Sequence, residues 1–397
     1  MSPVILLSVY ALLGFFEAWL VERCFKKWRR TAGRAGRMLK YWLVPYVLLS
    51  LLPVAGAFLP NGRIKFALQA AGNVWLGFYL YFGLLLLTCF LLAALVRLFS
   101  RGRAGKAWHG VMLTASFAVA LALVGYGMVH AHDTKVKRFD IRVEKPAGDL
   151  DSMRLVLLGD LHLSVNSRLS TIQRMVDLVN AEEPDAVLIA GDIFTSSYEA
   201  LSDPEAYAEA LRGLRSKYGV FAVYGNHDVE ETLFGGFPIS PISQAFRSVE
   251  MEAFMEKCGF RMLTDEVVRL GDAVQLAGRL DGEKAGDGTT NRLSEEALLA
   301  EADKNAPIIV MEHEPKCFEA LKKAGADLAL CGHTHAGQIF PGNLVTKLFN
   351  ENAWGYAKIH DLDTLVTAGV GYYGPPMRVG TDSEITVVNL VFQQEQP

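Results

Sequence analysis

Four apolar stretches fill the first third of this 397-residue chain, and they constrain its fold more than any other feature. A bilayer core of about 30 Å is crossed by roughly 20 apolar residues in a helix. The first stretch lacks the basic start of a cleaved signal peptide, and three more follow it. The sequence therefore predicts an α-helical membrane domain of four spans within residues 1–131, at approximately Pro3–Val21, Tyr41–Leu59, Gly72–Val96 and Ala107–Ala131.

The charge of the chain divides where these stretches end. Residues 1–131 hold 14 Lys and Arg and two acids, a net charge of +12, whereas residues 132–397 hold 25 Lys and Arg and 41 acids, a net charge of −16. This division excludes a single uniform soluble domain. It also excludes a broadly basic nucleic-acid-binding fold, so no nucleic-acid partner is expected.

Basic residues between the stretches predict an orientation. They gather after the first and third spans, and the positive-inside rule places both of these loops in the cytoplasm. Four basic residues soon after the last span argue weakly against this orientation. We therefore expect a multi-pass protein of the cell (inner) membrane, with everything after the fourth span outside the cytoplasm. The two basic groups are Arg23, Lys26, Lys27, Arg29, Arg30, Arg34, Arg37 and Lys40, and then Arg97, Arg101, Arg103 and Lys106.

The acidic part alternates short apolar runs with segments of helical periodicity. Met153–Leu158, Ala186–Ala190 and Val220–Tyr224 have the length and composition of buried strands. Leu169–Asn180 has the spacing of an amphipathic helix. Residues 150–397 are therefore predicted to form an α/β layered domain, joined to the membrane part by a short polar linker over residues 132–149.

Metal-ligand side chains follow these apolar runs, in most cases directly after a glycine. In open α/β sheets, ligands collect outside the carboxyl ends of the strands. A glycine lets the backbone turn tightly there, and residues two apart in an extended segment point the same way. Each motif alone is more often a turn or a surface histidine, but their conjunction predicts a metal site. The residues are Asp160, His162, Asp192, Asn226, His227, Asp228, His313, His333 and His335.

The order Asp-x-His, Gly-Asp, Gly-Asn-His-Asp, His and Gly-His-x-His resembles the calcineurin-like metallophosphoesterase family over roughly Met153–Leu390. The run from Gly332 to Gln338 and the ending Pro375–Arg378 resemble its membrane-tethered bacterial branch. The resemblance implies a four-layer metallophosphoesterase sandwich, in which two mixed β-sheets are flanked by helices.

The resemblance also implies roles for the site residues. One divalent metal would be held by Asp160, His162, Asp192 and His335. The second would be held by Asp192, Asn226, His313 and His333, so that Asp192 bridges the two. His227 would stabilise the transition state or protonate the leaving oxygen, and Asp228 would orient His227.

The chemistry of these ligands agrees with that assignment. Oxygen and imidazole ligands without thiolate suit Mn, Fe, Zn or Mg, of which we favour Mn. Two cations about 3.5–4 Å apart clamp a phosphate and activate a hydroxide that attacks phosphorus in line. We therefore expect a metal-dependent phosphoesterase that hydrolyses a phosphate ester at the membrane surface, with a phosphodiester favoured.

Two loops that follow metal motifs are unusually apolar, Leu233–Phe246 and Gly342–Trp354. They suggest a lipid-linked substrate, although their side chains could instead pack as a local core. Two other functions stay open. One is a lipid-linked pyrophosphatase such as UDP-2,3-diacylglucosamine hydrolase, whose cytoplasmic substrate the predicted orientation disfavours. The other is a non-catalytic membrane scaffold with a structural metal site.

Overall fold

A computed structural model describes residues 3–28, 41–99, 108–234 and 237–394. The chain forms two compact units. The helical unit comprises residues 1–128, 232–239 and 374–377, and the sheet unit comprises residues 129–231, 240–373 and 378–397. Two short segments of the carboxyl-terminal part therefore belong to the helical unit.

The helical unit contains two helices that are long and apolar enough to cross a membrane. Among the described residues these are Arg63–Val96 and Gly110–His130, which correspond to the third and fourth predicted spans. The helices of this unit are α1 (Pro3–Trp28), α3 (Leu43–Ser50), α4 (Leu52–Phe58), α5 (Arg63–Phe99) and α6 (Trp108–His130), and β5 (Leu233–Phe234) pairs with β6 (Phe237–Pro238) in the same unit.

The expectation of four spans needs correction, because only two helices in the described ranges qualify. The second predicted span is divided into α3 and α4, with a proline at the start of α4, where its missing N–H costs least. Each piece is too short to cross a bilayer. In α1, Glu17 is the one charged residue within the predicted span Pro3–Val21, and it is buried and accepts a hydrogen bond of 2.9 Å from the hydroxyl of Tyr46.

The sheet unit contains two mixed six-stranded sheets among the described residues. The first has the order β1 (Lys135–Val143), β14 (Glu384–Phe392), β2 (Ser152–Leu158), β3 (Ala186–Ala190), β4 (Val220–Val223) and β7 (Arg261–Met262). The second has the order β12 (Gly355–Ile359), β13 (Leu362–Val366), β11 (Leu328–Cys331), β10 (Ile308–Met311), β9 (Val274–Gly278) and β8 (Glu266–Leu270).

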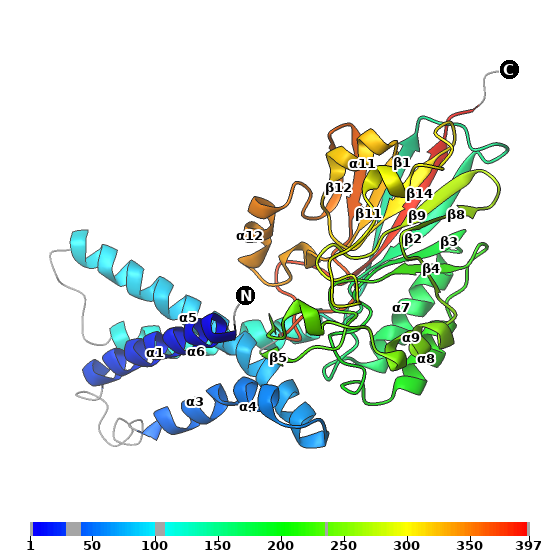
Figure 1. Ribbon diagram of the computed structural model, residues 1–397. Coiled ribbons are helices and arrows are strands. Elements are labelled where there is room, and N and C mark those ends of the chain that lie inside the picture. The colour runs from blue at the N-terminus through cyan, green and yellow to red at the C-terminus, as the bar shows by residue number, and fades with distance from the viewer. Residues whose placement is uncertain (1–2, 29–40, 100–107, 235–236, 395–397) are drawn as a thin grey trace. The chain divides into compact units, whose positions relative to one another are not determined.

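Helices cover the outer faces of both sheets. In β2, Leu155 and Leu157 pack between the two sheets, while Val156 and Leu158 pack against the helices on the other side. This alternation is the two-residue period of a strand that is buried on both faces. The covering helices are α7 (Leu169–Ala181), α8 (Pro204–Arg212) and α9 (Val249–Lys257) on the first sheet, and α10 (Glu295–Leu298) and α11 (Phe318–Ala324) on the second (Figure 1).

The expected fold of two mixed sheets flanked by helices is therefore present, but the expected linker is not wholly outside it. Within residues 132–149, β1 pairs in parallel with β14 over the register Lys135–Glu384 to Val143–Phe392. β14 in turn runs antiparallel to β2. No local pattern could reveal this pairing, because the partner strand lies about 250 residues further along the chain.

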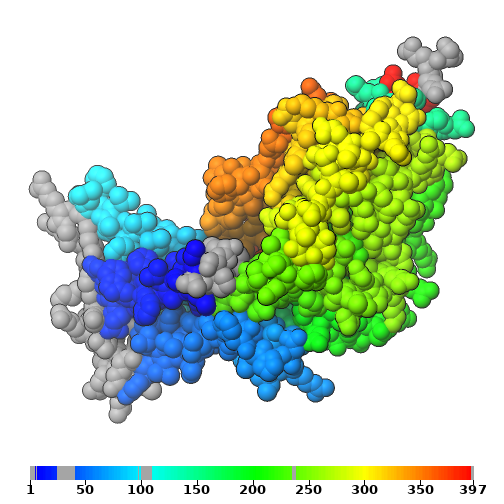
Figure 2. Space-filling model, viewed as in Figure 1, coloured from blue at the N-terminus to red at the C-terminus, as the bar shows by residue number. Residues whose placement is uncertain are grey.

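Three further elements complete the sheet unit. They are the one-turn helices η2 (Ile242–Gln244) and η3 (His335–Gly337) and the helix α12 (Gly342–Phe349). None of the residues of α12 is buried, and the orange atoms that include this helix stand on the surface of the sheet unit in Figure 2.

Candidate metal centre

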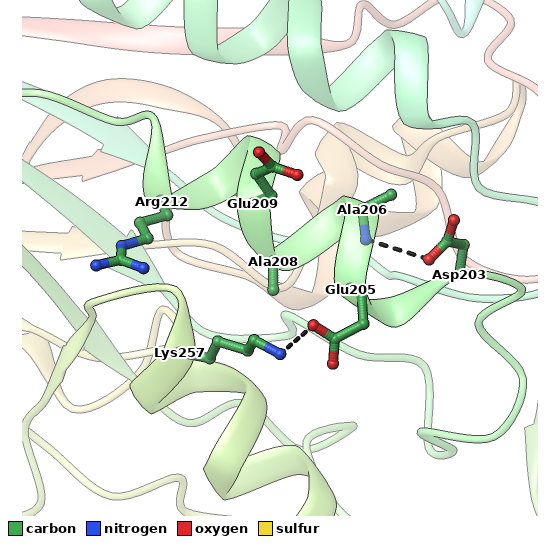
Figure 3. Close-up of a pocket in the computed structure, with 7 residues that line it drawn as sticks. All are labelled: Asp203, Glu205, Ala206, Ala208, Glu209, Arg212 and Lys257. Carbon is green, nitrogen blue, oxygen red and sulfur yellow. Dashed lines mark hydrogen bonds and ion pairs between the residues drawn. The ribbon is translucent and has the colours of Figure 1, made fainter.

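A hollow between α8 and α9 offers polar groups but none of the predicted site residues. It is lined by Asp203, Glu205, Ala206, Ala208, Glu209, Arg212 and Lys257 (Figure 3). Lys257 pairs with Glu205 across it, and Asp203 caps α8 through the N–H of Ala206. Lys257, Glu205 and Asp203 therefore serve contacts within and between these two helices.

The predicted site residues instead follow the carboxyl ends of parallel strands. Asp160 and His162 follow β2, Asp192 follows β3, and Asn226, His227 and Asp228 follow β4 in the first sheet. His313 follows β10, and His333 and His335 follow β11, in the second sheet. The structure thus brings residues from five strands of both sheets to one edge.

Several of these residues adopt a backbone conformation that side chains normally avoid. The φ angles of Asp160, His162, Asp192, His333 and His335 lie between 46° and 71°, in the left-handed region. Each such residue costs of order 1–3 kcal/mol, and the conformation persists only where the surrounding fold requires it. Backbone strain of this kind concentrates at functional sites.

The glycines beside the ligands allow the close approach that the sequence predicted. A Cβ on Gly191 would lie 2.7 Å from the backbone nitrogen of Gly225 and 2.8 Å from Nδ1 of His313. A Cβ on Gly332 would lie 2.8 Å from Oδ2 of Asp160. Since real Cβ atoms do not approach other atoms so closely, both positions require glycine.

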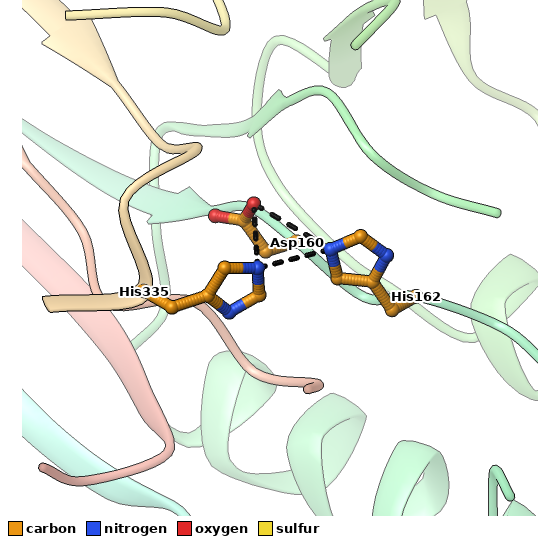
Figure 4. Close-up of side chains that lie close together, drawn as sticks. All are labelled: Asp160, His162 and His335. Atoms are coloured by element: carbon orange, nitrogen blue, oxygen red, sulfur yellow. Dashed lines mark hydrogen bonds and ion pairs between the residues drawn. The ribbon is translucent and has the colours of Figure 1, made fainter. Parts of the chain in front are cut away.

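One cluster of ligand atoms joins Asp160, His162 and His335 (Figure 4). The Nε2 atoms of His162 and His335 are 3.0 Å apart, and they lie 3.9 Å and 3.4 Å from Oδ1 of Asp160. All three side chains are buried. Two imidazole nitrogens and a carboxylate oxygen therefore converge on one point.

A second cluster joins Asp192, Asn226, His313 and His333. Nε2 of His313 lies 3.1 Å from Oδ2 of Asp192, 3.1 Å from Oδ1 of Asn226 and 3.2 Å from Nδ1 of His333. The same Oδ2 of Asp192 lies 3.5 Å from Nε2 of His162 in the first cluster. Asp192 therefore stands between the two clusters, the position that the resemblance implied for it.

These donors fit divalent cations. Nδ1 of His313 donates to the carbonyl of Ala190 over 2.7 Å, so Nε2 of that ring is the nitrogen that would bind a cation, after losing the proton that it shares with Asp192 in the absence of metal. Nδ1 of His162 similarly lies 3.0 Å from the hydroxyl of Thr195. A set of imidazole nitrogens and carboxylate and amide oxygens of this kind suits Mn, Fe, Zn or Mg.

Comparison with known proteins agrees with this geometry. The family model of the calcineurin-like phosphoesterases matches residues 153–337. A transmembrane protein with metallophosphoesterase domain from Danio rerio is 31% identical over 98% of this chain and 89% of its own length. The chain belongs to the calcineurin-like metallophosphoesterase family. An uncharacterized metallophosphoesterase of Helicobacter pylori (strain J99) is also 31% identical, over 68% of this chain and 69% of its own.

The alignment with the Danio rerio protein extends through the amino-terminal helices as well as the phosphoesterase domain. A Bos taurus protein of the same description is 30% identical over 69% of this chain and 61% of its own length. Together with α5 and α6, these relatives indicate that this metallophosphoesterase associates with a membrane.

Burial and the neighbouring charges set the protonation of the clusters. Burial lowers the pKa of His162 and of His333 to about 4, so both imidazoles are neutral and able to bind a cation at neutral pH. Burial would raise the pKa of Asp192, but His313 and His227 hold it well below its usual range. Burial raises the pKa of Asp160 to about 7, and a cation beside it would reverse that shift.

His227 lies at the rim of these clusters. Its Nδ1 is 3.1 Å from the hydroxyl of Ser196, and its ring lies against that of Tyr373 with centroids 4.5 Å apart. Its backbone N–H donates to Oδ1 of Asp192 over 2.8 Å. The imidazole is therefore fixed by Ser196 and Tyr373 beside the first cluster, where its ring centroid lies 5.6 Å from that of His162.

Asp228 does not orient His227 as the resemblance implied. Its Oδ1 accepts from the N–H of Phe194 over 2.8 Å, and its Oδ2 accepts from the N–H of Gly225 over 2.9 Å. Both oxygens are thus used to hold two strand-end loops together. The hydroxyl of Ser196, which the sequence reasoning missed, takes the position beside the imidazole.

Two cationic side chains near the centre were also missed. Arg378 is fully buried and donates to the carbonyls of Ala368, Gly369 and Gly371 behind His335. Lys284 donates to the carbonyl of Asn226 over 2.9 Å and pairs with Glu231. The Pro-Pro-Met-Arg run drew attention to Arg378 without revealing its role, and no sequence signal marked Lys284.

Proposed function

We propose that this metallophosphoesterase is a hydrolase with two divalent metals that cleaves phosphodiesters at a membrane surface. The observation that carries the proposal is the position of Asp192, whose Oδ2 lies 3.5 Å from an imidazole of the first cluster and 3.1 Å from an imidazole of the second. One carboxylate within reach of two donor clusters is the arrangement that a bridged pair of cations requires.

The chain offers a full ligand set to each cation. Asp160, His162, Asp192 and His335 would hold the first, and Asp192, Asn226, His313 and His333 would hold the second, with Mn favoured among Mn, Fe, Zn and Mg. When bound, the pair would lower the pKa of a water and offset the charge of the phosphate. Thr195 and the carbonyl of Ala190 keep His162 and His313 turned toward the cations.

His227 is the residue that we assign to the leaving oxygen. Ser196 holds its Nδ1, and the ring of Tyr373 limits its rotation. With both ring nitrogens protonated, Nδ1 would donate to the hydroxyl of Ser196, and Nε2 would give its proton to the alkoxide that departs from phosphorus, leaving a neutral imidazole. General acid catalysis of this kind contributes typically 10²–10⁴-fold in rate.

A balance of formal charge favours a diester over a monoester. Two divalent cations and the carboxylates of Asp160 and Asp192 leave two positive charges, which a hydroxide nucleophile and a monoanionic diester offset. A monoester dianion would leave one negative charge in excess. Two cationic side chains near the clusters would not bind the second charge of a monoester: the charge of Lys284 is offset by Glu231, and the N–H groups of Arg378 donate to carbonyl oxygens.

The membrane setting follows from α5 and α6. The connection between them contains Arg101, Arg103 and Lys106, and basic connections stay in the cytoplasm. A pair of spans that turns in the cytoplasm leaves the phosphoesterase domain outside it. We therefore propose a multi-pass inner-membrane protein with an extracytoplasmic active site, and a phosphate ester carried on a lipid as its substrate.

The proposal is tested by turnover of the purified full-length protein with Mn added. Bis-p-nitrophenyl phosphate, p-nitrophenyl phosphate and lipid phosphates in vesicles are compared side by side. Faster hydrolysis of the diester is expected, whereas a preference for the monoester would contradict the phosphodiester assignment. If the vesicle-borne phosphates are all inert while the soluble diester turns over, the lipid-borne substrate is wrong and the phosphodiesterase stands.

A further inference from the structure

The helix α12 presents an apolar surface that no other part of the sheet unit covers. Leu344, Val345, Leu348 and Phe349 are 53%, 49%, 80% and 81% exposed, and Phe340 just before the helix is 48% exposed. Residues spaced by three or four positions share one face of a helix. We call these five side chains the α12 patch.

The α12 patch does not build a local core. No residue of α12 is buried, although side chains of this kind ordinarily are. Single exposed apolar residues need no explanation, but four that share one face of a helix, with a fifth just before it, mark an interaction surface. The alternative that the side chains of the Gly342–Trp354 loop pack as a local core therefore does not hold for this helix.

The path of the chain places the membrane tether at the edge of the sheets where the metal site lies. β1 is parallel to β14, and β14 is antiparallel to β2, so β1 runs against β2. Its first residue, Lys135, therefore lies at the edge where β2 ends and the metal ligands begin. Four residues separate the end of α6 from Lys135, and they reach at most about 14 Å.

The α12 patch is fastened to that same edge. The N–H of Phe340 donates to the carbonyl of Val379 over 2.8 Å. Three residues further on, Asp382 accepts from Nζ of Lys137 in β1 over 2.9 Å. One short loop thus connects the start of α12 with the strand that receives the tether.

We propose that the α12 patch lies in the lipid surface of the bilayer that holds α5 and α6. An amphipathic helix in such a position buries its apolar face about 5–10 Å into the boundary between headgroups and acyl chains. Lipid is the partner that we assign to the patch, because the connection from α6 enters the sheet unit at the edge that carries both the α12 patch and the metal site. The proposal rests on the membrane setting of the proposed function and not on hydrolysis.

The contact with lipid brings the metal centre to the bilayer surface. His335 and Phe340 are joined by η3 and a turn in which Gln338 accepts from the N–H of Tyr373 over 2.7 Å. A phosphate at the headgroup level would then reach the clusters without leaving the bilayer. The α12 patch therefore gives a physical reason for a lipid-borne substrate.

A depth measurement on the full-length protein tests the proposal. Exposed Cys317 is first replaced by Ser, and Leu348→Cys is labelled with an environment-sensitive fluorophore. The protein is reconstituted into phosphatidylcholine–phosphatidylglycerol vesicles, with and without lipids that carry a quencher at the top of the acyl chain. Asp272→Cys is the matched control, because Asp272 is exposed beside the start of β9, at the opposite end of the parallel strands.

A blue shift and quenching of the Leu348→Cys label, with neither at Asp272→Cys, is the expected result. A Leu348→Cys label that stays as solvated as the control overturns the proposal. A label shielded equally in detergent, with cross-linking between copies, also overturns it and indicates a protein interface instead.

A second variant tests the proposal without relying on the label at Leu348→Cys. Leu348→Asp with Phe349→Asp should fold, because both side chains are at least 80% exposed, and should abolish quenching of a label at Leu344→Cys. Its turnover of soluble bis-p-nitrophenyl phosphate should be unchanged. A parent protein that shows lipid quenching but no turnover would contradict only the proposed function. A double variant in which the quenching is unchanged would contradict only the proposal that the α12 patch lies in the lipid surface.

Discussion

The backbone N–H of His227 donates to Oδ1 of Asp192 over 2.8 Å, while Oδ2 of the same carboxylate faces both ligand clusters. The assigned proton donor and the bridging ligand are therefore fixed to each other through main chain. This hydrogen bond keeps the imidazole of His227 at a fixed distance from the carboxylate of Asp192. The proton donor would therefore stay beside the phosphate that the metals would hold.

Asp192→Asn should abolish hydrolysis and lower the metal content. The amide keeps the shape but removes the negative charge between the two clusters, so both cations bind less tightly. Loss of a side chain that only orients a metal ligand typically lowers metal affinity or activity 10–100-fold. Loss of the ligand charge itself should lower turnover at least about 100-fold. Turnover of bis-p-nitrophenyl phosphate and elemental analysis of the purified protein measure the two effects.

Asp177→Asn is the control for this change, because Asp177 is an exposed residue of α7. It should leave both readouts unaltered. Full activity in Asp192→Asn would contradict the bridged pair of metals.

His227→Ala should separate catalysis from metal binding. Turnover should fall by about 10²–10⁴-fold, while the metal content should match that of the parent protein. The loss should be smaller for a p-nitrophenyl ester than for an alkyl ester, because p-nitrophenolate departs without a proton. An equal loss for both leaving groups would assign His227 to charge stabilisation rather than proton transfer.

Asp228→Asn should lower the free energy of unfolding without changing proton transfer to the leaving group. An amide has one acceptor oxygen, so the N–H of Phe194 or of Gly225 loses its partner at a cost of about 1–3 kcal/mol. In a domain of this size, each kcal/mol lowers the Tm by about 2–4 °C. Thermal unfolding measures the change, and the leaving-group dependence of the remaining activity should equal that of the parent protein. A selective loss with alkyl esters would restore the orienting role that the contacts of Asp228 deny.

Removal of the metals with a chelator should abolish turnover and lower the Tm. A ligand at about 100 times its Kd stabilises the folded state by about 2.7 kcal/mol, which corresponds to roughly 5–10 °C here. Mn added back should restore both properties, and Mg, Zn and Fe added separately would rank the metals. An unchanged Tm with restored turnover would place the metals at the surface rather than in the buried clusters.

The sequence could predict features that local residue patterns encode. The lengths of uncharged runs located α5 and α6, and the apolar runs before Asp160, Asp192 and Asn226 located β2, β3 and β4. The division of the second span into α3 and α4 was missed, because a hydropathy count ignores the hydrogen bond that Pro53 cannot donate. The strand β1 was missed because its apolar partner comes from the far end of the chain.

By itself, the sequence determined the types of ligand, their order and the family to which they belong, because glycines, carboxylates and imidazoles at strand ends are readable one motif at a time. Only the tertiary structure decided which side chain stands beside His227 and where the α12 patch lies. Ser196 and not Asp228 contacts the imidazole of His227, because both oxygens of Asp228 accept from the buried N–H groups of Phe194 and Gly225. The need of these N–H groups for an acceptor arises only when strands from distant parts of the chain meet.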